Sequence, residues 1–264
     1  GGSAYYVHDH VSAAKKAAFI HVDYVQAGYT RRLDKDCYVD FDRIFAVSDE
    51  TAGVFAGVYP ECQQKLSVFH NLIDTEAIRQ KALSPAEKSM HEGIRLLTVG
   101  RLTPQKGFDC AVYALKLLLE KQYPVYWYII GEGPEYGRLT QLARSLHVED
   151  HFIFLGMQNN PYPYFKMADF YIHATRFEGK SIAIQEAQVL GCAIAASDCS
   201  GNREQIVSGV DGLLCPFSPE GIANAVEYLI EHPQTAESFG RAAAQKACHF
   251  ENDIHMIRDL LYSP

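Results

Sequence analysis

Short apolar runs alternate with helix-length amphipathic stretches along the second part of the chain. The apolar runs cover residues 94–100, 125–131, 151–156, 169–174, 193–197 and 212–216. They do not alternate strictly with polar residues, which is typical of strands buried on both faces. The pattern predicts helices at residues 108–121, 135–146, 162–168, 181–190 and 219–231. Because strands that alternate with helices form parallel sheets, residues 93–248 are expected to form a complete Rossmann-like domain.

The first part of the chain carries a shorter version of this pattern. Its apolar runs lie at residues 15–22, 43–48 and 65–69, with helices predicted at 49–58 and 75–83. Three strands make a thin α/β layer, so residues 1–84 are expected to be the later half of a second lobe. The chain is therefore expected to be a truncated form of a longer protein. Two more helices are predicted at residues 234–248 and 252–262.

The predicted helix at 181–190 places a carboxylate among apolar residues. At about 100° per residue, one stripe contains five apolar residues, with Gln185 and Gln188 off it: Ile182, Ala183, Ala187, Val189 and Leu190. Glu186 lies in the middle of that stripe. A buried carboxylate is costly without partners. Two interpretations stay open: Glu186 is paired within the protein, or the helix packs on the sheet and directs Glu186 into a cleft.

Composition excludes several classes of function. The chain has 264 residues, 48% hydrophobic and 21% charged, with a net charge of −8, and it contains no long basic run. We therefore expect no nucleic-acid partner. No apolar run approaches the roughly 18 residues of a membrane span. Seven cysteines without a CxxC pair favour the reducing cytosol. His8 and His10 lack further ligands nearby, so we expect no metal site.

The loop after the strand at 94–100 suits an anion. In a doubly wound sheet, ligands bind beyond the carboxyl ends of the strands. Gly100 allows a tight exit, Arg101 and Lys106 flank the loop, and Gly107 opens the next helix. A helix N-terminus beside two cations favours a phosphate or diphosphate. An ordinary loop with surface cations is the alternative.

The loop after the strand at 125–131 reads GEGPEYGRL. It is weakly similar to a dinucleotide-binding loop, but Pro134 and Glu135 break the spacing, and its acidic residues would repel a pyrophosphate. We therefore predict a simple turn, which counts against an NAD-dependent oxidoreductase.

The loop after the strand at 169–174 reads TRFEGKSIAIQEA. Glu178 lies in the loop, and Gly179, Lys180 and Ser181 lead into the helix with free backbone N–H groups. Glu178 can accept hydrogen bonds from one set of ligand hydroxyls and Glu186 from a second. Two carboxylates, a basic pair and a helix N-terminus describe a pocket for a molecule with vicinal hydroxyls and a diphosphate, such as a nucleotide sugar.

Four segments, in order, resemble the donor domain of glycosyltransferase family 4, the group 1 glycosyltransferases with the GT-B fold. They are GRLTPQKGFD, IIGEGPEYGRL, FIFLGMQNNPYPYFKMADFYIHATRFEGKSIAIQEAQVLGCAIAASD and EQIVSGVDGLLCP. The resemblance covers residues 95–249. FIHVDY, RIFAVSD and FHNLID resemble the later half of that family's acceptor domain. The implied fold is α/β of the GT-B type, with two Rossmann-like lobes of which the N-terminal one is incomplete. Residues 249–264 would form the helix that crosses back to that lobe.

The resemblance also implies roles for individual residues. Arg101 and Lys106, beside Gly100, would hold the donor diphosphate in place of a metal. Glu178 would contact the transferred sugar, with the N–H groups of Gly179, Lys180 and Ser181 nearby. Glu186 would bind the ribose hydroxyls, and His21 would approach the sugar from the acceptor lobe. Glu178 and His21 are thus the expected catalytic residues.

The implied function is transfer of a sugar from a nucleotide-sugar donor, such as a UDP-sugar, to a saccharide or lipid-linked acceptor. The expected setting is capsule, polysaccharide or cell-envelope biosynthesis in the cytoplasm, with a peripheral contact to the inner membrane face through the region before Gly1. The transfer would be retaining and independent of metal, with no cofactor besides the donor. A GT-B epimerase or phosphorylase and a non-catalytic nucleotide-sugar binding fragment stay open. Glu178-Gly-Lys-Ser replaces the family's usual Glu-Gly-Phe-Gly, so the sugar is left undefined.

Overall fold

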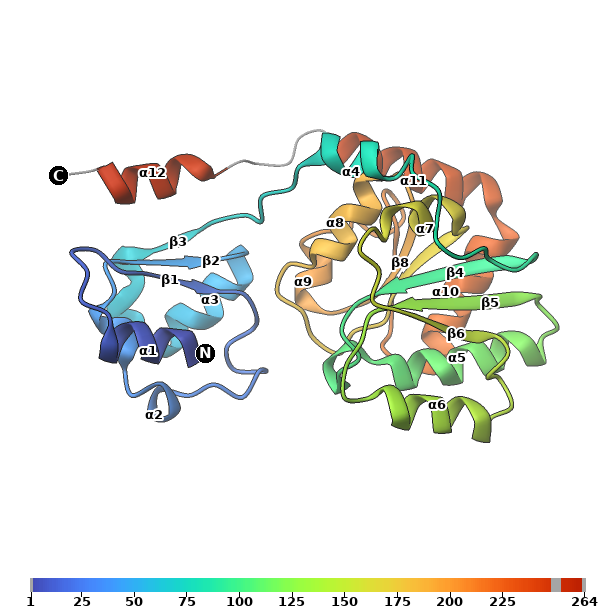
Figure 1. Cartoon of the computed structure of the whole chain (residues 1–264), viewed down its shortest axis with the longest axis horizontal. Helices are drawn as coiled ribbons and strands as arrows, with labels where there is room; N and C mark the ends of the chain where they lie inside the picture. The colour runs from blue at the N-terminus through green and yellow to red at the C-terminus, as the bar shows by residue number, and fades with distance from the viewer. Residues whose placement is uncertain (1, 248–252, 263–264) are drawn as a thin grey trace. The chain divides into compact units, whose positions relative to one another are not determined.

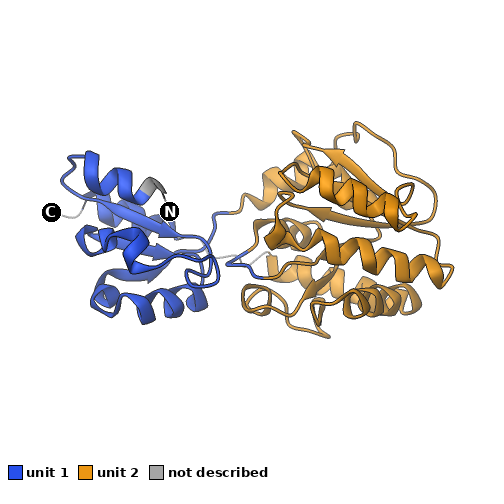
Figure 2. Cartoon of the chain, turned by 90° about the horizontal axis from the view of Figure 1, so that it is seen from below, with its two compact units in different colours: residues 1–72, 177–180, 251–264 blue, residues 73–176, 181–250 orange. Residues whose placement is uncertain are grey.

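The chain forms two compact units. A computed structural model describes residues 2–247 and 253–262 (Figure 1). Unit 1 comprises residues 1–72, 177–180 and 251–264, and unit 2 comprises residues 73–176 and 181–250 (Figure 2).

Unit 2 is built on a sheet of six parallel strands: β4 (Ile94–Val99), β5 (Val125–Ile130), β6 (Phe152–Gly156), β7 (Phe170–His173), β8 (Ala193–Ser197) and β9 (Leu213–Cys215). Their order is β6-β5-β4-β7-β8-β9. The chain therefore builds the sheet outwards from β4 in one direction and from β7 in the other. The boundary between β4 and β7 is the topological switch point, where sheets of this order bind ligands.

Helices cover both faces of this sheet. One apolar cluster packs α5 (Phe108–Glu120), α6 (Tyr136–Ser145) and α10 (Pro219–Glu231) against one face. A second cluster packs α7 (Tyr162–Met167) and α8 (Ile182–Val189) against the other (Figure 1). Strands and helices alternate in unit 2 as the sequence pattern predicted, and the strands form a parallel sheet.

A polar chain runs through the first cluster across the centre of the sheet. Trp127 on β5 is fully buried, and its Nε1 donates to Thr98 Oγ1 on β4 at 2.9 Å. Thr98 Oγ1 donates in turn to the carbonyl oxygen of Ile172 on β7 at 2.7 Å. The hydrogen bonds satisfy both buried groups and tie the two strands at the switch point together.

Unit 1 contains a smaller parallel sheet, in the order β1 (Ala17–Ile20), β2 (Arg43–Ala46) and β3 (Leu66–Val68). The three strands and α3 (Asp49–Val58) lie where the sequence predicted them. Ser48 starts α3 because its Oγ accepts from the backbone N of Thr51 at 3.2 Å. The sequence did not predict α1 (Gly2–His10), α2 (Arg31–Asp34), or the short 3₁₀ turns η1 (Cys37–Asp40) and η2 (Pro60–Lys65).

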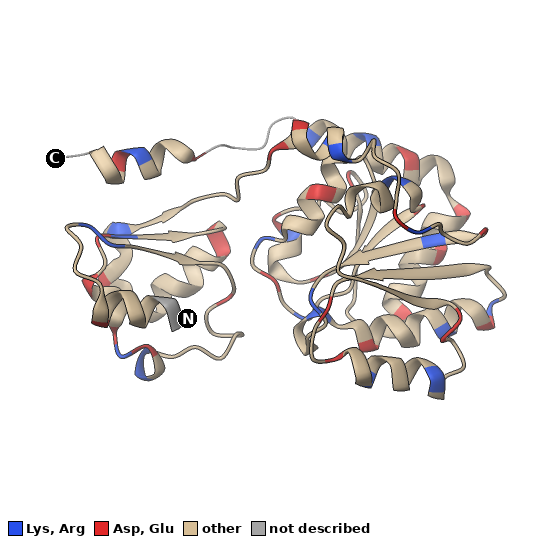
Figure 3. Cartoon of the chain, in the orientation of Figure 1, with Lys and Arg blue, Asp and Glu red and all other residues tan. Residues whose placement is uncertain are grey.

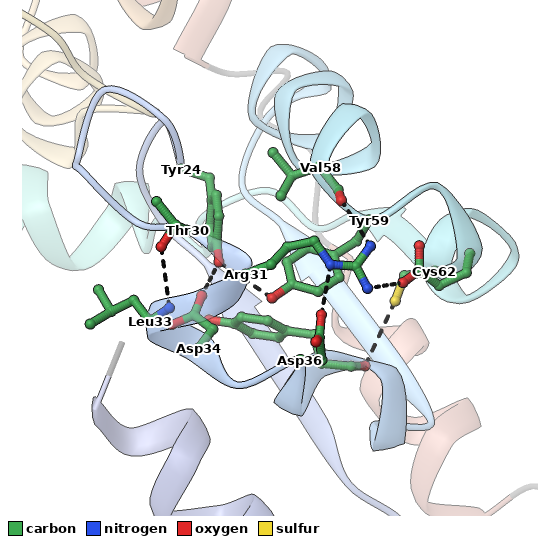
Figure 4. A network of polar contacts seen from close by, with 11 residues as sticks. Tyr24, Thr30, Arg31, Leu33, Asp34, Asp36, Val58, Tyr59 and Cys62 are labelled. Atoms are coloured by element: carbon green, nitrogen blue, oxygen red, sulfur yellow. Dashed lines mark hydrogen bonds and ion pairs between the residues drawn. The ribbon is translucent and has the colours of Figure 1, made fainter.

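A buried acid organises the core of unit 1 (Figure 4). Asp34 is fully buried and accepts hydrogen bonds from the hydroxyls of Tyr5 and Tyr24. Burial, followed by the nearby Asp34 carboxylate, raises the pKa of Tyr24. Arg31 at the start of α2 pairs with Asp36 at 2.6 Å and Glu61 at 2.5 Å. These contacts fasten α1, α2 and η2 to one another, so we assign the network a structural role.

The segments around α4 and the C-terminus differ from the predicted domain bounds. α4 (Thr75–Lys81) belongs to unit 2, whereas the sequence placed residues 1–84 in the N-terminal lobe. The reason is that Ile78 on α4 packs with Val189 on α8 and Ala247 on α11 (Pro233–Ala247). Cys248 and Asn252, at the predicted helix bounds, lie outside the described residues.

The last helix, α12 (Ile254–Tyr262), is part of unit 1. The Asp253 carboxylate that precedes it accepts from the backbone N of His70 at 2.7 Å, just after β3. Of the expected apolar stripe, Ile254, Ile257 and Leu260 are half-buried, but Leu261 is 65% exposed. The crossover assigned to residues 249–264 stays a prediction.

Charged residues of both signs are interspersed over the helices and loops, while the strands of unit 2 carry few of them (Figure 3). Within the described residues, no helix combines the length and the apolar character that a membrane crossing needs. The short η3 (Pro104–Lys106) and α9 (Ser200–Arg203) lie in the loops after β4 and β8.

Candidate functional site

The loops after β4 and β7 meet at the switch point of unit 2. Gly107 follows η3 with a φ of +63°, and a Cβ there would lie 2.4 Å from the carbonyl oxygen of Ala174. Glycine is required for this approach because a side chain would clash with the backbone and strain φ. The N-terminal end of α5 is thereby held against the end of β7.

Hydrogen bonds fix the two loops to each other. The carbonyl oxygen of Gln105 accepts from the backbone N of Arg176 at 2.9 Å and from Thr175 Oγ1 at 3.1 Å. Arg176 Nη1 donates to the carbonyl oxygen of Pro104 at 2.5 Å. The sequence singled out none of these three contacts, because they join residues about seventy positions apart that no local pattern connects.

Arg176 also pairs with Asp109 in the first turn of α5, at 3.0 and 2.7 Å. Burial alone would raise the pKa of Asp109, but the guanidinium outweighs it and holds that pKa below its usual range. The pair offsets the negative charge of Asp109, which would otherwise oppose the binding of an anion at the same helix N-terminus.

The cationic loop predicted from the sequence connects β4 to α5. The side chain of Lys106 folds over Gly100, with its Cδ 3.7 Å from where a Cβ of Gly100 would stand. Arg101 is exposed and Lys106 is half-buried. No side chain caps the N-terminus of α5, whose capping position is Gly107. Backbone N–H groups at such an end are available to an anion.

The neighbouring loop after β5, which the sequence predicts to be a simple turn, packs against the loop after β4. A Cβ on Gly131 would lie 2.0 Å from the carbonyl oxygen of Gly100. The backbone N of Leu102 donates to the carbonyl oxygen of Glu132 at 2.9 Å. The loop therefore braces the exit of β4, where Gly100 and Arg101 lie.

The orientation of α8 corrects the stripe expected from the sequence. Ile182 is 50% exposed, whereas Gln185 and Gln188 are buried. Gln188 can be buried because its Nε2 donates to the carbonyl oxygen of Gln205 at 2.8 Å. α8 packs against α4 and α11 as well as against the sheet. It therefore does not have one buried apolar face and one exposed polar face.

Glu186 is half-buried on α8, and it has a partner within the protein. Tyr162 at the start of α7 donates its hydroxyl to Glu186 Oε1 at 2.9 Å. Burial raises the pKa of Glu186 more than this hydrogen bond lowers it, and no charged group among the described residues contributes. The sequence pattern did not single out Tyr162. The only local signal was a tyrosine at the first position of a predicted helix.

The other predicted residues fall in unit 1, namely His21, Glu178, Gly179 and Lys180. A Cβ on Gly179 would lie 2.3 Å from the carbonyl oxygen of His21, so this segment lies directly against the end of β1. Asn71 Nδ2 donates to the carbonyl oxygen of Lys180 at 3.1 Å. Glu178 is buried. The imidazole of His21 stacks on Phe19, with ring centroids 5.8 Å apart, and partial burial lowers its pKa.

Gly100, Arg101, Lys106, Ser181 and Glu186 belong to unit 2. Ser181 is buried at the capping position of α8, where its side chain makes no capping hydrogen bond. Within the described residues, no three His, Cys, Asp or Glu side chains form a group that could hold a metal ion. His8 instead contacts Asp9 at 2.6 Å and Asp40 at 2.7 Å.

A parallel sheet of this order, with a cationic loop at its switch point, is found in enzymes that act on nucleotide-linked substrates. The family model for glycosyl transferases group 1 matches residues 79–246, and the chain belongs to this family.

Two of the curated relatives illustrate the activities that their names specify. The chain is 30% identical over 200 residues to N-acetylgalactosamine-N,N'-diacetylbacillosaminyl-diphospho-undecaprenol 4-alpha-N-acetylgalactosaminyltransferase of Campylobacter jejuni, covering 75% of this chain and 53% of that enzyme. It is 28% identical over 118 residues to N-acetyl-alpha-D-glucosaminyl L-malate synthase of Bacillus anthracis, covering 44% of this chain and 31% of that enzyme. The chain thus spans about half the length of such relatives, or less.

Solved glycosyltransferase structures share the fold. HepE of Anabaena, in complex with UDP and glucose, superposes with a TM-score of 0.80 at 19% identity, over 95% of this chain and 72% of HepE. TarM superposes with a TM-score of 0.80 at 16% identity, over 99% of this chain and 53% of TarM. The GT-B type of α/β fold predicted from the sequence is confirmed.

Proposed function

We propose that the protein transfers a sugar from a nucleotide-sugar donor to a saccharide or lipid-linked acceptor, with retention and without a metal ion. One observation carries this proposal. Lys106 directly precedes Gly107 at the uncapped N-terminus of α5, and Arg101 lies at the exit of β4, at the switch point between β4 and β7. Such a place favours a diphosphate, because N–H groups and fixed positive charges converge on it.

The donor would extend from this loop towards α8. Arg101 and Lys106 neutralise the leaving diphosphate, which makes a divalent cation unnecessary. Glu186 accepts hydrogen bonds from the ribose hydroxyls. Solved neighbours of the same fold contain UDP or UDP-glucose, which supports a UDP-sugar as the first donor to test.

Glu178 and His21 are proposed to serve the transferred sugar. Glu178 accepts from the sugar's hydroxyls, with the N–H groups of Gly179, Lys180 and Ser181 nearby. The ring acquires positive character as its bond to the diphosphate breaks, and a carboxylate stabilises that state more than the ground state. Retention follows if the leaving phosphate assists the incoming hydroxyl on the same face of the sugar.

The proposed class of acceptor is based on the name of a relative. The name of the Campylobacter enzyme specifies a diphospho-undecaprenol acceptor, which favours a lipid-linked saccharide and a place in cell-envelope biosynthesis. The cytoplasmic face of the membrane is the proposed location, because nucleotide sugars are used there.

The test uses this chain and a longer protein, made by joining a complete N-terminal lobe to this chain, because the chain spans about half the length of its relatives. A thermal-shift panel of UDP, GDP, ADP and their sugar conjugates identifies the donor, and an assay with and without saccharide acceptors follows in the longer protein. Acceptor-dependent release of the nucleoside diphosphate that persists in EDTA supports the proposal. Release without an acceptor indicates an epimerase, and sugar transfer to inorganic phosphate indicates a phosphorylase. Binding without turnover in the longer protein would leave only a nucleotide-sugar binding role.

A further inference from the structure

Glu186 touches an uncharged hydrogen-bond donor and, among the described residues, no cation. The hydroxyl of Tyr162 lies 2.9 Å from Oε1 of Glu186. A carboxylate oxygen that is held in this way cannot rotate freely, while the other oxygen keeps its full capacity to accept. An arginine or lysine in the same place would orient the carboxylate but would also neutralise it.

The ring of Tyr162 is itself held in place. It packs against the apolar cluster formed by Ile78 on α4, Val189 on α8 and Ala247 on α11. Tyr162 is half-buried, so its hydroxyl reaches Glu186 from a ring with little freedom to move. Burial, followed by the Glu186 charge, raises the pKa of Tyr162 to about 12, so its hydroxyl keeps its proton at neutral pH.

The turn before α7 is tied to the same helix. Asn160 Nδ2 donates to the carbonyl oxygen of Lys81 at the end of α4, at 2.8 Å. Asn160 Oδ1 accepts from the backbone N of Tyr162 at 3.4 Å. Both the backbone and the ring of Tyr162 are therefore anchored to α4, the first helix of unit 2.

We propose that Tyr162 is a positioning residue for the donor nucleotide. It holds Oε1 of Glu186 so that Oε2 accepts from the two ribose hydroxyls. The inference rests on the proposed function, because it assigns the ribose to Glu186. It adds that recognition of the ribose depends on α4, through Asn160 and Tyr162, and not on α8 alone.

The test uses calorimetry to measure how much more tightly the protein binds a nucleotide that has ribose hydroxyls than one that lacks them. The probe is whichever of UDP, GDP and ADP binds the unmutated protein most tightly, together with its 2′,3′-dideoxy analogue. We expect Tyr162→Phe to weaken binding of the ribonucleotide about threefold to tenfold, the effect of one ordinary hydrogen bond. Binding of the dideoxy analogue should not change, since it offers Glu186 no hydroxyl.

Tyr164→Phe is the matched control. Tyr164 lies on the same helix, but its hydroxyl accepts from the backbone N of Lys88 at 3.0 Å and donates to Gln158 Oε1 at 3.4 Å. The substitution should leave the ratio of the two affinities unchanged, even if it lowers the melting temperature. Tyr162→Phe retains the aromatic ring, so the apolar cluster stays filled in the test variant.

Three outcomes would overturn the inference. In the first, Tyr162→Phe weakens both nucleotides equally, as a purely structural residue would. In the second, Tyr162→Phe changes neither affinity. In the third, the unmutated protein does not distinguish the ribonucleotide from its dideoxy analogue. A different result would contradict the proposed function itself, namely that the unmutated protein binds none of the three diphosphates. In the three outcomes above, the protein still binds a nucleoside diphosphate, so the two kinds of failure can be distinguished.

Discussion

Gly107 and Ala174 approach so closely that a Cβ on Gly107 would stand 2.4 Å from the carbonyl oxygen of Ala174. This contact joins the start of α5 to the end of β7, and so it sets the separation of the two loops beside which the diphosphate is proposed to lie.

Gly107→Ala should therefore destabilise unit 2. The positive φ and the backbone clash together should lower the free energy of unfolding by roughly 3 kcal/mol. Denaturant titration measures this loss. Gly137→Ala is the control, because Gly137 lies in α6 with open space around it, and alanine there should stabilise the helix by about 0.5–1 kcal/mol. Equal effects of the two substitutions would contradict the role assigned to Gly107.

Lys106→Ala should remove most of the preference for a nucleoside diphosphate over the monophosphate. Charge-assisted contacts contribute about 1.5–3 kcal/mol each, which corresponds to roughly a tenfold to hundredfold loss in affinity for the diphosphate. Titration with UDP and UMP measures the difference. Lys116→Ala, further along α5 where Lys116 pairs with Glu120 at 3.6 Å, should leave the preference intact. A protein that binds UDP and UMP equally well before mutation would refute the assignment.

Glu186→Gln should raise the stability of the ligand-free protein while it weakens nucleotide binding. The folded-state pKa of Glu186 lies above its ordinary value of 4.5 because of burial. The raised pKa of Glu186 therefore makes its full contribution to the free energy of unfolding below about pH 4.5. That contribution is lost as pH rises through the folded-state pKa. The melting temperature of the variant, relative to the unmutated protein, should thus increase between about pH 4 and pH 8.

The exposed Glu237, which pairs at the surface with Arg241, provides the control for nucleotide binding. Glu237→Gln should leave the affinity for UDP unchanged. A Glu186→Gln variant that melts earlier at every pH, yet binds UDP normally, would show that the carboxylate serves the fold and not a ligand.

Glu178→Gln should separate sugar recognition from nucleotide binding. We expect UDP affinity to stay within about twofold, since the proposed contact is to the sugar, while turnover in the longer protein falls by roughly a hundredfold or more. Steady-state kinetics with the donor found in the nucleotide panel measures this. A variant that loses UDP affinity and turnover together would place Glu178 at the nucleotide instead.

The parallel sheet was predictable because buried strands and amphipathic helices alternate with little interruption. The position of Gly100, Arg101 and Lys106 followed from the rule that ligands lie beyond the carboxyl ends of such strands. The orientation of α8 did not follow. Helical periodicity assumes one buried face, but Gln188 is buried by a hydrogen bond to Gln205, and Ile182 is left exposed at the first turn.

Contacts between distant residues were also beyond sequence reasoning. Tyr162 and Glu186 are 24 positions apart, and Tyr5 reaches Asp34 from 29 positions away. Neither pair has a spacing that a helix or strand would predict, because the fold alone brings them together. The sequence of α1 shows no clear apolar stripe, and its pairing with Asp34 gives the helix a tertiary reason to form.

Trp127, held by Thr98 in the core of unit 2, is the single tryptophan of the chain. Unit 1 instead buries Tyr24, Tyr38 and Tyr59 around Asp34. Unit 2 therefore carries an optical probe that unit 1 lacks. Indole fluorescence excited selectively will report the loss of structure in unit 2 alone, while tyrosine absorbance also senses unit 1. If the two signals change at different denaturant concentrations, the units unfold as separate cooperative bodies.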